Sequence, residues 1–530
     1  MAADRLSALP DDLLQHILSF APEREAAASA VLSRRWRTLW RRESALDLDI
    51  RPYMAADEGQ DLRNSPSPLD ALLSDAVAAL AAFPRRGGGT VLKRLTLFLD
   101  LNDVDSSYDS VDDPEPVDDG RVAGLLADPA AAGLEEVLIG CEHGRMRTTT
   151  YGLPLASMAC AATLRVLELE SCNFEPPLSP RRAFPCLTEL RLRHCFFKEG
   201  CLQAMVDAAP ALTSLSLDRV SQQPPDSAFQ AMPAYCWVPF RLRCLTATTL
   251  ELKTYSVGAE EEDLARIGIE LDMPSLRYFR YTGDAIKLSL ASPAPGLSSV
   301  DLNASLRGEQ SQWEPTSRML VSFSSTRALK LHVNCMNDII YGEEEHGGAI
   351  LPTFPNLKLL ELDEFFEYTS SSAALAMARL LRSCPVMSEL RLNLNMTRWY
   401  RDDEPKTNDP ARSPFAQSMD RFNRLASMTA SSRRVSELPA VLTDDGAFTC
   451  LQTSLRKVTL QFNANELDCF QVQLAKFLVE NAMVLEEMHV DDGNTFWLDH
   501  LCNKLERWRA DSFRRRNLTD TARFRVHHLE

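Results

Sequence analysis

The chain has 530 residues, of which 45% are hydrophobic and 25% are charged, and its formal net charge at pH 7 is −17. A chain of this length and composition can bury a large core, either in several domains or in one long array of repeats. The acidic balance argues against a nucleic-acid-binding protein, because such a protein would carry a basic surface.

The segment 4–42 predicts two or three short helices. Pro10 suits the first turn of a helix, because the N–H group that proline lacks would have no partner there. The run L-L-x-x-I-L over 13–18 has the spacing of one apolar helix face. Ser33 can cap a last helix, which carries the tryptophans and leucine of 36–40. A segment of about 40 residues cannot bury this many large side chains alone, so we expect it to dock onto a partner.

These residues resemble the plant type of F-box. The chain has its signature L-P-x-x-L-L-x-x-I-L-S-F, followed by V-L-S-x-R-W-x-x-L-W, within residues 4–42. The resemblance implies that the segment binds a Skp-type adaptor, which attaches F-box proteins to a cullin–RING ubiquitin ligase. The adaptor-binding residues that it implies are Leu9, Pro10, Leu13, Leu14, Ile17, Leu18, Val31, Leu32, Ser33, Trp36, Leu39 and Trp40.

A polar stretch over 54–68 then predicts a linker, and the apolar spacing that follows predicts an amphipathic helix over 69–83. From there to residue 447 the dominant pattern is L-x-x-L-x-L, recurring mostly at about 20–35 residues, which is typical of irregular leucine-rich repeats. We therefore expect an α/β repeat fold, a helical F-box head followed by an irregular leucine-rich-repeat solenoid. Within this region the pattern starts at Leu92, Leu134, Leu164, Leu187, Leu212, Leu242, Leu276, Leu297, Thr326, Leu357 and Met387, and two further copies start beyond it, at Leu455 and Leu485.

Three details of the repeats carry further expectations. The repeat consensus has Asn or Cys three residues after the last leucine, where it hydrogen-bonds the turn that leaves the strand. The return segment 373–381 has the apolar spacing of a helix, and the polar stretch 399–414 predicts a long loop. The residues at the consensus turn position are Cys172, Cys195, Asn334, Asn395 and Asn463.

The carboxyl-terminal region shows a second resemblance. Residues 448–492 resemble the FBD module of plant F-box/leucine-rich-repeat proteins and predict a strand, a helix and a strand that act as a terminal repeat. Residues 493–530 then predict a basic helical tail, whose run Arg507 to Arg516 we expect to pack with its arginines facing outward.

The third, fifth and seventh positions of L-x-x-L-x-L-x should face outward from the strands, and there acidic and basic residues roughly alternate. In one interpretation, neighbouring side chains pair with each other, and each surface pair contributes at most about 1 kcal/mol. In the other, the basic residues bind a target protein through an acidic or phosphorylated segment, because arginine matches carboxylate and phosphate. The candidate target-binding residues are Arg191, Arg193, Tyr278, Arg280, Lys330 and Arg391.

Enzymatic and metal-binding motifs are not found in the sequence. It contains no G-x-S-x-G elbow and no glycine-rich phosphate loop, and its His and Cys residues lack zinc-site spacing. We therefore expect no catalytic residues, no metal and no cofactor. The 13 cysteines are scattered without any C-x-x-C pair, and we find neither a signal region nor an apolar run of about 18 residues that could span a membrane. We expect an intracellular soluble protein, cytoplasmic or nuclear.

The function implied by the F-box resemblance is that of the substrate-recognition subunit of a Skp–cullin–F-box ubiquitin ligase. The F-box would bind the adaptor, and the repeats would bind the target protein. The alternative is a leucine-rich-repeat scaffold that binds partners outside any ligase, with its amino-terminal helices serving as a cap. Co-purification of a Skp-type adaptor would distinguish the two.

Overall fold

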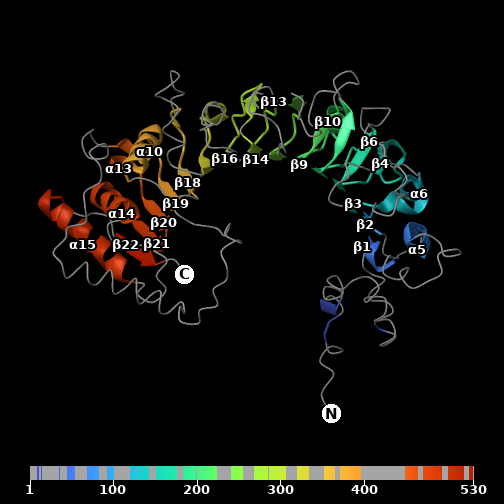
Figure 1. Ribbon diagram of the computed structural model, residues 1–530, viewed down its shortest axis with the longest axis horizontal. Coiled ribbons are helices and arrows are strands. Elements are labelled where there is room, and N and C mark those ends of the chain that lie inside the picture. Colours follow the sequence, from blue (N-terminus) through green and yellow to red (C-terminus); the bar gives the residue numbers. More distant parts are fainter. Residues whose placement is uncertain are drawn as a thin grey trace, which may run out of the picture. The chain divides into compact units, whose positions relative to one another are not determined.

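The computed structural model describes residues 9–10, 13–14, 35, 45–53, 68–82, 92–100, 120–142, 151–175, 183–198, 200–223, 240–254, 268–284, 286–305, 319–333, 351–364, 370–394, 448–462, 470–491, 499–518 and 524–528. The chain divides into two compact units, Met1–Ala259 (unit 1) and Glu260–Glu530 (unit 2). Each unit contains a run of parallel strands with helices beside them (Figure 1).

In unit 1, successive parallel strands align their leucines in one register. Leu192 lies opposite Leu169 of the preceding strand and Leu217 of the next, and all three side chains are fully buried. Because side chains alternate along a strand, this register turns every leucine row into the core and every intervening row to the surface. The strands, in spatial order, are β1 (Ala45–Asp49), β2 (Arg94–Asp100), β3 (Glu136–Glu142), β5 (Val166–Glu170), β7 (Glu189–Arg193), β9 (Ser214–Asp218) and β12 (Thr249–Thr254).

Threonine hydroxyls at the start of these strands connect one repeat to the next. The Thr188 hydroxyl donates to the carbonyl of Arg165, at 3.1 Å, and the Thr213 hydroxyl donates to the carbonyl of Thr188, at 3.0 Å. The Thr248 hydroxyl continues the series with the carbonyl of Thr213, at 3.2 Å. The same carbonyls also accept the backbone N–H groups of these threonines, so the hydroxyls add a second bond from each threonine and help to fix the register between repeats.

A left-handed residue follows each of three consecutive strands of unit 1. Ser171, His194 and Arg219 have φ values of 57°, 51° and 51°. Each donates its N–H to the carbonyl at the end of the next strand, at 2.8 Å in all three cases. The corner directs the chain into a second parallel sheet, made by β4 (Tyr151–Pro154), β6 (Cys172–Glu175), β8 (Phe196–Lys198) and β10 (Ser221–Gln223).

Two of the predicted turn residues lie just after these corners. Cys172 and Cys195 are fully buried. The Cys172 thiol donates to the carbonyl of Glu170, at 3.3 Å, and the Cys195 thiol donates to the carbonyls of Arg193 and Leu169, at 3.2 and 3.4 Å. The predicted hydrogen-bonding role is therefore confirmed for both cysteines. The remaining three predicted turn residues, Asn334, Asn395 and Asn463, lie outside the described residues.

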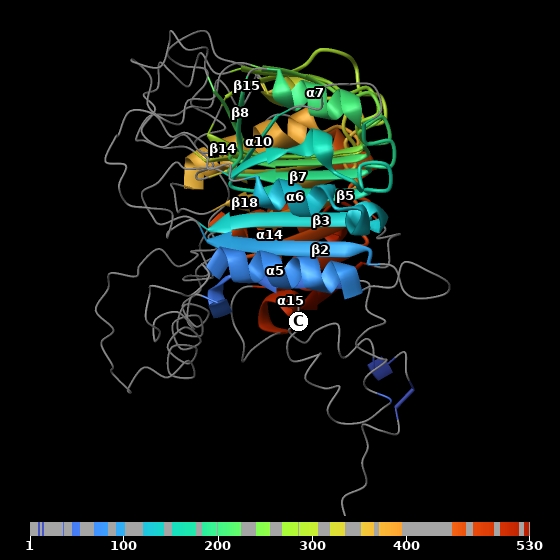
Figure 2. The ribbon, with the colours of Figure 1, turned by 90° about the vertical axis from the view of Figure 1, so that its right-hand side faces the viewer.

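The helices of unit 1 lie beside its strands (Figure 2). The helix predicted over 69–83 is confirmed as α5 (Pro68–Ala82), and its residues Leu72, Ala76 and Leu80 are buried. It contacts β1 and the short helix α6 (Arg121–Ala127). A third helix, α7 (Cys201–Ala208), buries Met205 and Val206. The predicted linker 54–68 lies outside the described residues except for its last residue, which begins α5.

Unit 2 repeats the arrangement with aromatic residues in some leucine positions. Tyr281 lies opposite Leu302, which lies opposite Leu331, and all three are buried. A separate parallel pair is formed by β13 (Gly268–Asp272) and β15 (Lys287–Leu290). The main strands are β14 (Tyr278–Asp284), β16 (Ser299–Ser305), β17 (Ala328–Val333), β18 (Leu359–Glu364), β19 (Glu389–Asn393), β20 (Lys457–Gln461), β21 (Glu487–Asp491) and β22 (Arg525–His528).

The helices of unit 2 gather beside its later strands (Figure 1). The predicted return helix is α10 (Ser370–Ser383), and it contacts α13 (Thr449–Thr453) and α14 (Phe470–Asn481). The strand, helix and strand predicted for the FBD-like segment correspond to β20, α14 and β21. The predicted basic tail forms α15 (Asp499–Arg515), which contacts α14 and the last strand, β22.

One arginine of α15 departs from the prediction that the arginines face outward. Arg509 is only 1% exposed, whereas Arg507 and Arg514 are exposed as predicted. The Arg509 guanidinium donates to the carbonyls of Val479, Ala482 and Leu485, at 3.2, 2.9 and 3.4 Å. These carbonyls lie at and just beyond the end of α14, where helical carbonyls have no partner within the helix, so the buried cation caps that helix.

The repeat predicted to start at Leu242 is wrong in its register. Leu245, which that register places in the core, is 50% exposed. The main strand begins at residue 249 instead, and Ala247, Leu250 and Leu252 fill the three leucine positions, each fully buried. Because alanine takes the first leucine position, the pattern does not mark the true start. Leu242 and Leu245, just before it, fit the leucine spacing instead. Leu242 belongs to the short strand β11 (Phe240–Arg243).

Candidate functional site

Only part of the predicted adaptor-binding set lies within the described residues. Leu13 is 49% exposed, whereas the neighbouring Leu14 is fully buried, and its N–H donates to the carbonyl of Pro10, at 3.1 Å. Arg35 donates from Nη2 to the carbonyl of Leu9, at 2.5 Å. Leu13 is thus available to a partner, while Leu14 packs inward. The residues of the set that lie outside the described part are Ile17, Leu18, Val31, Leu32, Ser33, Trp36, Leu39 and Trp40.

In unit 1, the two predicted target-binding arginines share one carboxylate. Glu168 on β5 lies 3.0 Å from Nη1 of Arg191 and 3.5 Å from Nη2 of Arg193, and both arginines are on β7. Arg191 also contacts Glu189 on its own strand, at 2.7 Å. The side chain of Glu168 is 14% exposed and that of Arg191 is 41% exposed, so the guanidinium covers the carboxylate.

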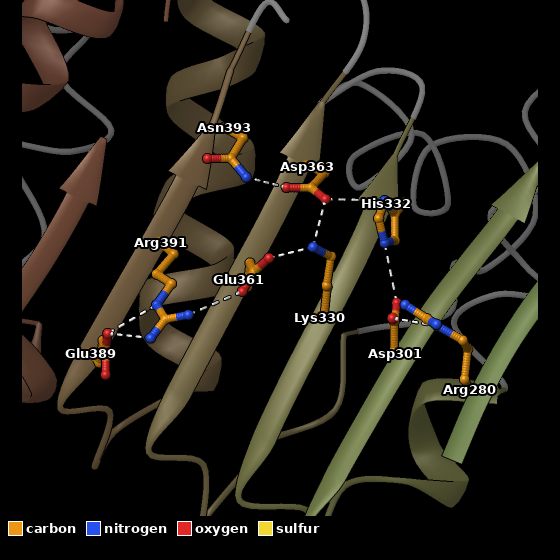
Figure 3. A network of polar contacts seen from close by, with 9 residues as sticks. All are labelled: Arg280, Asp301, Lys330, His332, Glu361, Asp363, Glu389, Arg391 and Asn393. Carbon is orange, nitrogen blue, oxygen red and sulfur yellow. Dashed lines mark hydrogen bonds and ion pairs between the residues drawn. The ribbon is translucent and has the colours of Figure 1, made fainter. Parts of the chain in front are cut away.

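In unit 2, the predicted cations form a row with acidic residues across the neighbouring strands β14, β16, β17, β18 and β19 (Figure 3). Nε of Arg280 lies 2.9 Å from Oδ2 of Asp301 on the next strand. Lys330 contacts Glu361, whose other oxygen lies 3.6 Å from Nη1 of Arg391. The positive and negative residues therefore alternate from β14 to β19. Each such partly exposed pair contributes at most about 1 kcal/mol.

A second row runs beside the first and includes a histidine between two carboxylates (Figure 3). Nε2 of His332 lies 3.1 Å from Oδ1 of Asp301, and Nδ1 lies 3.2 Å from Oδ2 of Asp363. Asp363 also accepts a hydrogen bond from Asn393 and lies 2.9 Å from Nζ of Lys330. A neutral imidazole donates from one nitrogen only, so a protonated His332 would donate to both carboxylates.

The ion pairs shift the pKa values of three of their members in the expected directions. The hydrogen bond with Glu168 raises the pKa of Arg191, although burial would lower it, and Glu189 adds to the rise. Burial alone would raise the pKa of Asp301, but hydrogen bonds from His332 and Arg280 outweigh it and lower the pKa below its usual value. Burial would lower the pKa of Lys330, and its two carboxylate partners raise the pKa above the usual value instead. The ion pairs thus favour the charged forms of Arg191, Asp301 and Lys330.

All five predicted target-binding cations therefore have acidic partners within their own unit. This is the arrangement that the first interpretation of the alternating charges describes. Tyr278, the sixth predicted residue, lies partly buried on β14, two residues before Arg280. Direct binding of a target to the six residues stays a prediction. The sequence pattern also placed Asp301 and His332 at outward positions, but it contained no signal that they form one network.

The described residues contain no group of three or more His, Cys, Asp or Glu side chains that could hold a metal ion. Within the same residues, no helix is long and apolar enough to cross a membrane. The described cysteines are free thiols, and all except the exposed Cys186 are buried. Burial raises the pKa of Cys160 to about 11 and that of Cys195 to about 12, which suppresses the reactive thiolate.

Two protein-family models match the chain. The F-box domain model matches residues 6–46. A second model, described as the leucine-rich repeats of the FBD-associated F-box protein At5g56370, matches residues 122–248. The second match includes strands β3 to β9 of unit 1, which carry Glu168 and its partners Arg191 and Arg193. The chain therefore carries an F-box and leucine-rich repeats.

Curated relatives extend the similarity over most of the chain. It is 22% identical over 507 residues to the putative F-box/FBD/LRR-repeat protein At5g22610 of Arabidopsis thaliana, covering 93% of this chain and 84% of that protein. It is 23% identical over 362 residues to the F-box/FBD/LRR-repeat protein At1g80470 of the same plant, covering 67% and 66%. The predicted resemblance to plant F-box/leucine-rich-repeat proteins with an FBD-like module is thereby confirmed.

Proposed function

We propose that this chain is the substrate-recognition subunit of a Skp–cullin–F-box ubiquitin ligase. The observation that carries the proposal is the F-box match over residues 6–46, combined with the exposure of Leu13 next to the buried Leu14. A leucine side chain that remains half-exposed in the free chain, as Leu13 does, is suited to an adaptor. Burying a leucine side chain at an interface stabilises a complex by about 1.5–3 kcal/mol.

The repeats would then hold the target protein. In each unit the described strands run parallel in sequence order, which supports an irregular leucine-rich-repeat solenoid behind a helical F-box head. The strands of a solenoid carry outward side chains, and the six predicted target-binding residues occupy such positions on β7, β14, β17 and β19. Residues 448–492 and the tail 493–530 would close the array as its terminal repeat and cap.

In this proposal, the chain supplies positioning and no bond-breaking chemistry of its own. Holding a target beside the ligase makes ubiquitin transfer effectively intramolecular, which raises the effective concentration of the target. A Skp-type adaptor and, through it, a cullin–RING ligase would supply the catalytic part. The proposal implies that the protein works inside the cell, in the cytoplasm or the nucleus, without a cofactor.

Co-purification tests the proposal. The full-length chain is expressed with a Skp-type adaptor, and the complex is followed through affinity and size-exclusion chromatography. We expect the adaptor to co-elute with the chain and a chain lacking residues 1–42 to lose it. The rival function, a repeat scaffold outside any ligase, requires that the adaptor fail to co-elute with the intact chain.

A matched pair of substitutions separates binding from folding. Leu13→Ala changes an exposed side chain and should weaken adaptor binding while leaving the melting temperature of the free chain unchanged. Leu14→Ala changes a buried side chain and should disturb the local fold as well as binding. An adaptor that binds both variants as tightly as the wild type would contradict the assignment of this face.

A further inference from the structure

The outward face of the first strands of unit 1 differs from the paired charges described above, because an aromatic ring lies on it. Phe98 on β2 occupies an outward position, opposite Asp49 on β1 and Gly140 on β3. Its side chain is partly exposed. At the corresponding positions on the next two strands the chain has Glu170 and Arg193, so Phe98 is the apolar residue of a charged row.

Gly140 lets the ring of Phe98 lie against the sheet. A Cβ atom at position 140 would meet Cδ2 of Phe98 at 3.2 Å and Cε2 at 3.5 Å. The backbone of Gly140 has no positive φ, so lack of space rather than backbone conformation is the reason that a side chain is disfavoured here. The same Cβ position lies 3.8 Å from Oε2 of Glu170. The ring and a carboxylate therefore border the same spot on the outward face.

The chain itself places a guanidinium on this ring. Cζ of Arg51 lies 5.0 Å from the centre of the Phe98 ring, within the range of a cation–π contact. Asp49 holds the guanidinium from the adjacent outward position, with Nε of Arg51 2.8 Å from Oδ2 of Asp49. The side chain of Arg51 is nevertheless 66% exposed. An arginine between an aromatic ring and a carboxylate is thus an arrangement that this face already accommodates.

The charges around the ring are mostly negative. Asp47 and Asp49 on β1, Glu136 on β3, and Glu168 and Glu170 on β5 all occupy outward positions. Glu168 is neutralised by Arg191 and Arg193, and Asp49 by Arg51. Glu136 lies 3.8 Å from Arg94, an outward cation on β2. Among the described residues, neither Asp47 nor Glu170 forms an ion pair. The face therefore complements a positively charged partner better than a negatively charged one.

We propose that the outward face of β1, β2, β3 and β5 binds a basic segment of the target protein, with an arginine side chain that takes the place of Arg51 on Phe98 and pairs with Glu170. Arginine suits this position because its planar guanidinium stacks on an aromatic ring and pairs with a carboxylate at the same time. The inference rests on the proposed function, in that the repeats bind a target, and it names the chemical class of that target.

A phosphorylated or acidic segment fits this face less well. The cations of this face are already engaged, Arg51 by Asp49 and the arginines at 191 and 193 by Glu168, so an anionic partner would first have to displace those carboxylates. It would also approach the unpaired carboxylates of Asp47 and Glu170. Like charges brought together at an interface oppose binding. If the experiment below selects acidic peptides, the target is instead an acidic or phosphorylated segment.

The test selects ligands from a random library of 12-residue peptides displayed on phage, using the full-length chain as bait. Selected peptides are then synthesised with a fluorescent label, and their binding is measured by anisotropy. We expect the selected peptides to contain arginine. Replacement of that arginine by citrulline, which keeps the shape but removes the charge, should weaken binding at least tenfold.

Variants of the chain locate the site. Glu170→Gln, which keeps the side-chain shape, should weaken peptide binding at least fivefold, and Phe98→Ala should do the same. Glu189→Gln is the matched control, because Glu189 is an outward carboxylate already paired with Arg191, and it should bind the peptide as the wild type does. Melting temperatures show whether Phe98→Ala folds, and Glu170→Gln keeps the test decisive if it does not.

Three results would overturn the inference: no enriched peptide, enriched peptides that are acidic or lack arginine, or binding that Glu170→Gln leaves unchanged. The proposed function is tested separately on the same variants. Glu170→Gln and Phe98→Ala should both retain the Skp-type adaptor, since they lie outside the F-box. If the wild-type chain fails to bind the adaptor, only the ligase proposal is refuted. An arginine-dependent peptide site on this face would still stand.

Discussion

Replacing Arg509 by methionine should destabilise the end of unit 2. Methionine has a similar length and fills much of the space, but it has no donors for the three carbonyls that Arg509 now satisfies. A buried acceptor that loses its partner costs about 1–3 kcal/mol. The guanidinium also lies 4.4 Å from the ring centre of Phe513 and 4.7 Å from that of Phe524, contacts that each contribute about 0.5–2 kcal/mol.

With partial relaxation around the methionine, the expected loss is about 3–5 kcal/mol, a large share of the roughly 5–15 kcal/mol that stabilises a typical domain. Hydrogen exchange followed by mass spectrometry measures this loss locally. Since every 1.4 kcal/mol is a factor of ten, peptides from α14 and α15 should exchange at least about a hundredfold faster than in the wild type.

Arg507→Met is the control for Arg509→Met, because Arg507 lies on the same helix with its side chain exposed. It should leave the exchange rates of α14 and α15 nearly unchanged, as exposed substitutions usually change stability by about 0.5 kcal/mol or less. Equal exchange rates in the two variants would refute the idea that the buried guanidinium caps α14.

Three further predictions concern the repeats. Leu190→Asp should lower the melting temperature sharply, because it buries a charge at a fully buried position, whereas the exposed Arg193→Asp should change it little; equal shifts would contradict the strand register. Maleimide labelling with peptide mapping should modify the exposed Cys186 much faster than Cys195, whose pKa burial raises to about 12; equal rates would contradict the buried thiols. The pKa of Asp301 is lower in the folded chain than its unfolded value of about 3.9, so its stabilising effect is present above that pH and lost below it. The stability difference between wild type and Asp301→Asn in urea unfolding should therefore shrink from pH 5 to pH 3, and a constant difference would refute this contribution.

Much of the repeat architecture could be predicted because leucine spacing reports directly on burial. The register around Leu190 and Leu192 followed from two clear copies of the pattern, and the structure buries both residues fully. The prediction was wrong at Leu242, where alanine replaces leucine in the true repeat and an exposed leucine precedes it. A pattern that counts apolar residues cannot distinguish an exposed leucine from a buried one when both have acceptable spacing.

Other features could not be predicted because they depend on contacts distant in the sequence. The left-handed corners at Ser171, His194 and Arg219 are occupied by residues other than glycine, so no sequence signal marks them. The strand β22 has the sequence R-V-H-H, in which polar residues outnumber apolar ones. Phe98 is the seventh residue of the repeat that starts at Leu92. Its role depends on Gly140 in the next strand, and that pairing becomes visible once the register is known.

The most direct test of the central claim is the affinity of the full-length chain for a purified Skp-type adaptor, measured by isothermal titration calorimetry. The account predicts a defined complex whose dissociation constant rises at least tenfold in Leu13→Ala combined with Ile17→Ala, and likewise in Trp36→Ala. A tenfold change corresponds to about 1.4 kcal/mol, less than a large apolar anchor often contributes to an interface. No binding by the wild-type chain, or unchanged affinity in both variants, would contradict the claim that this chain acts as an F-box receptor.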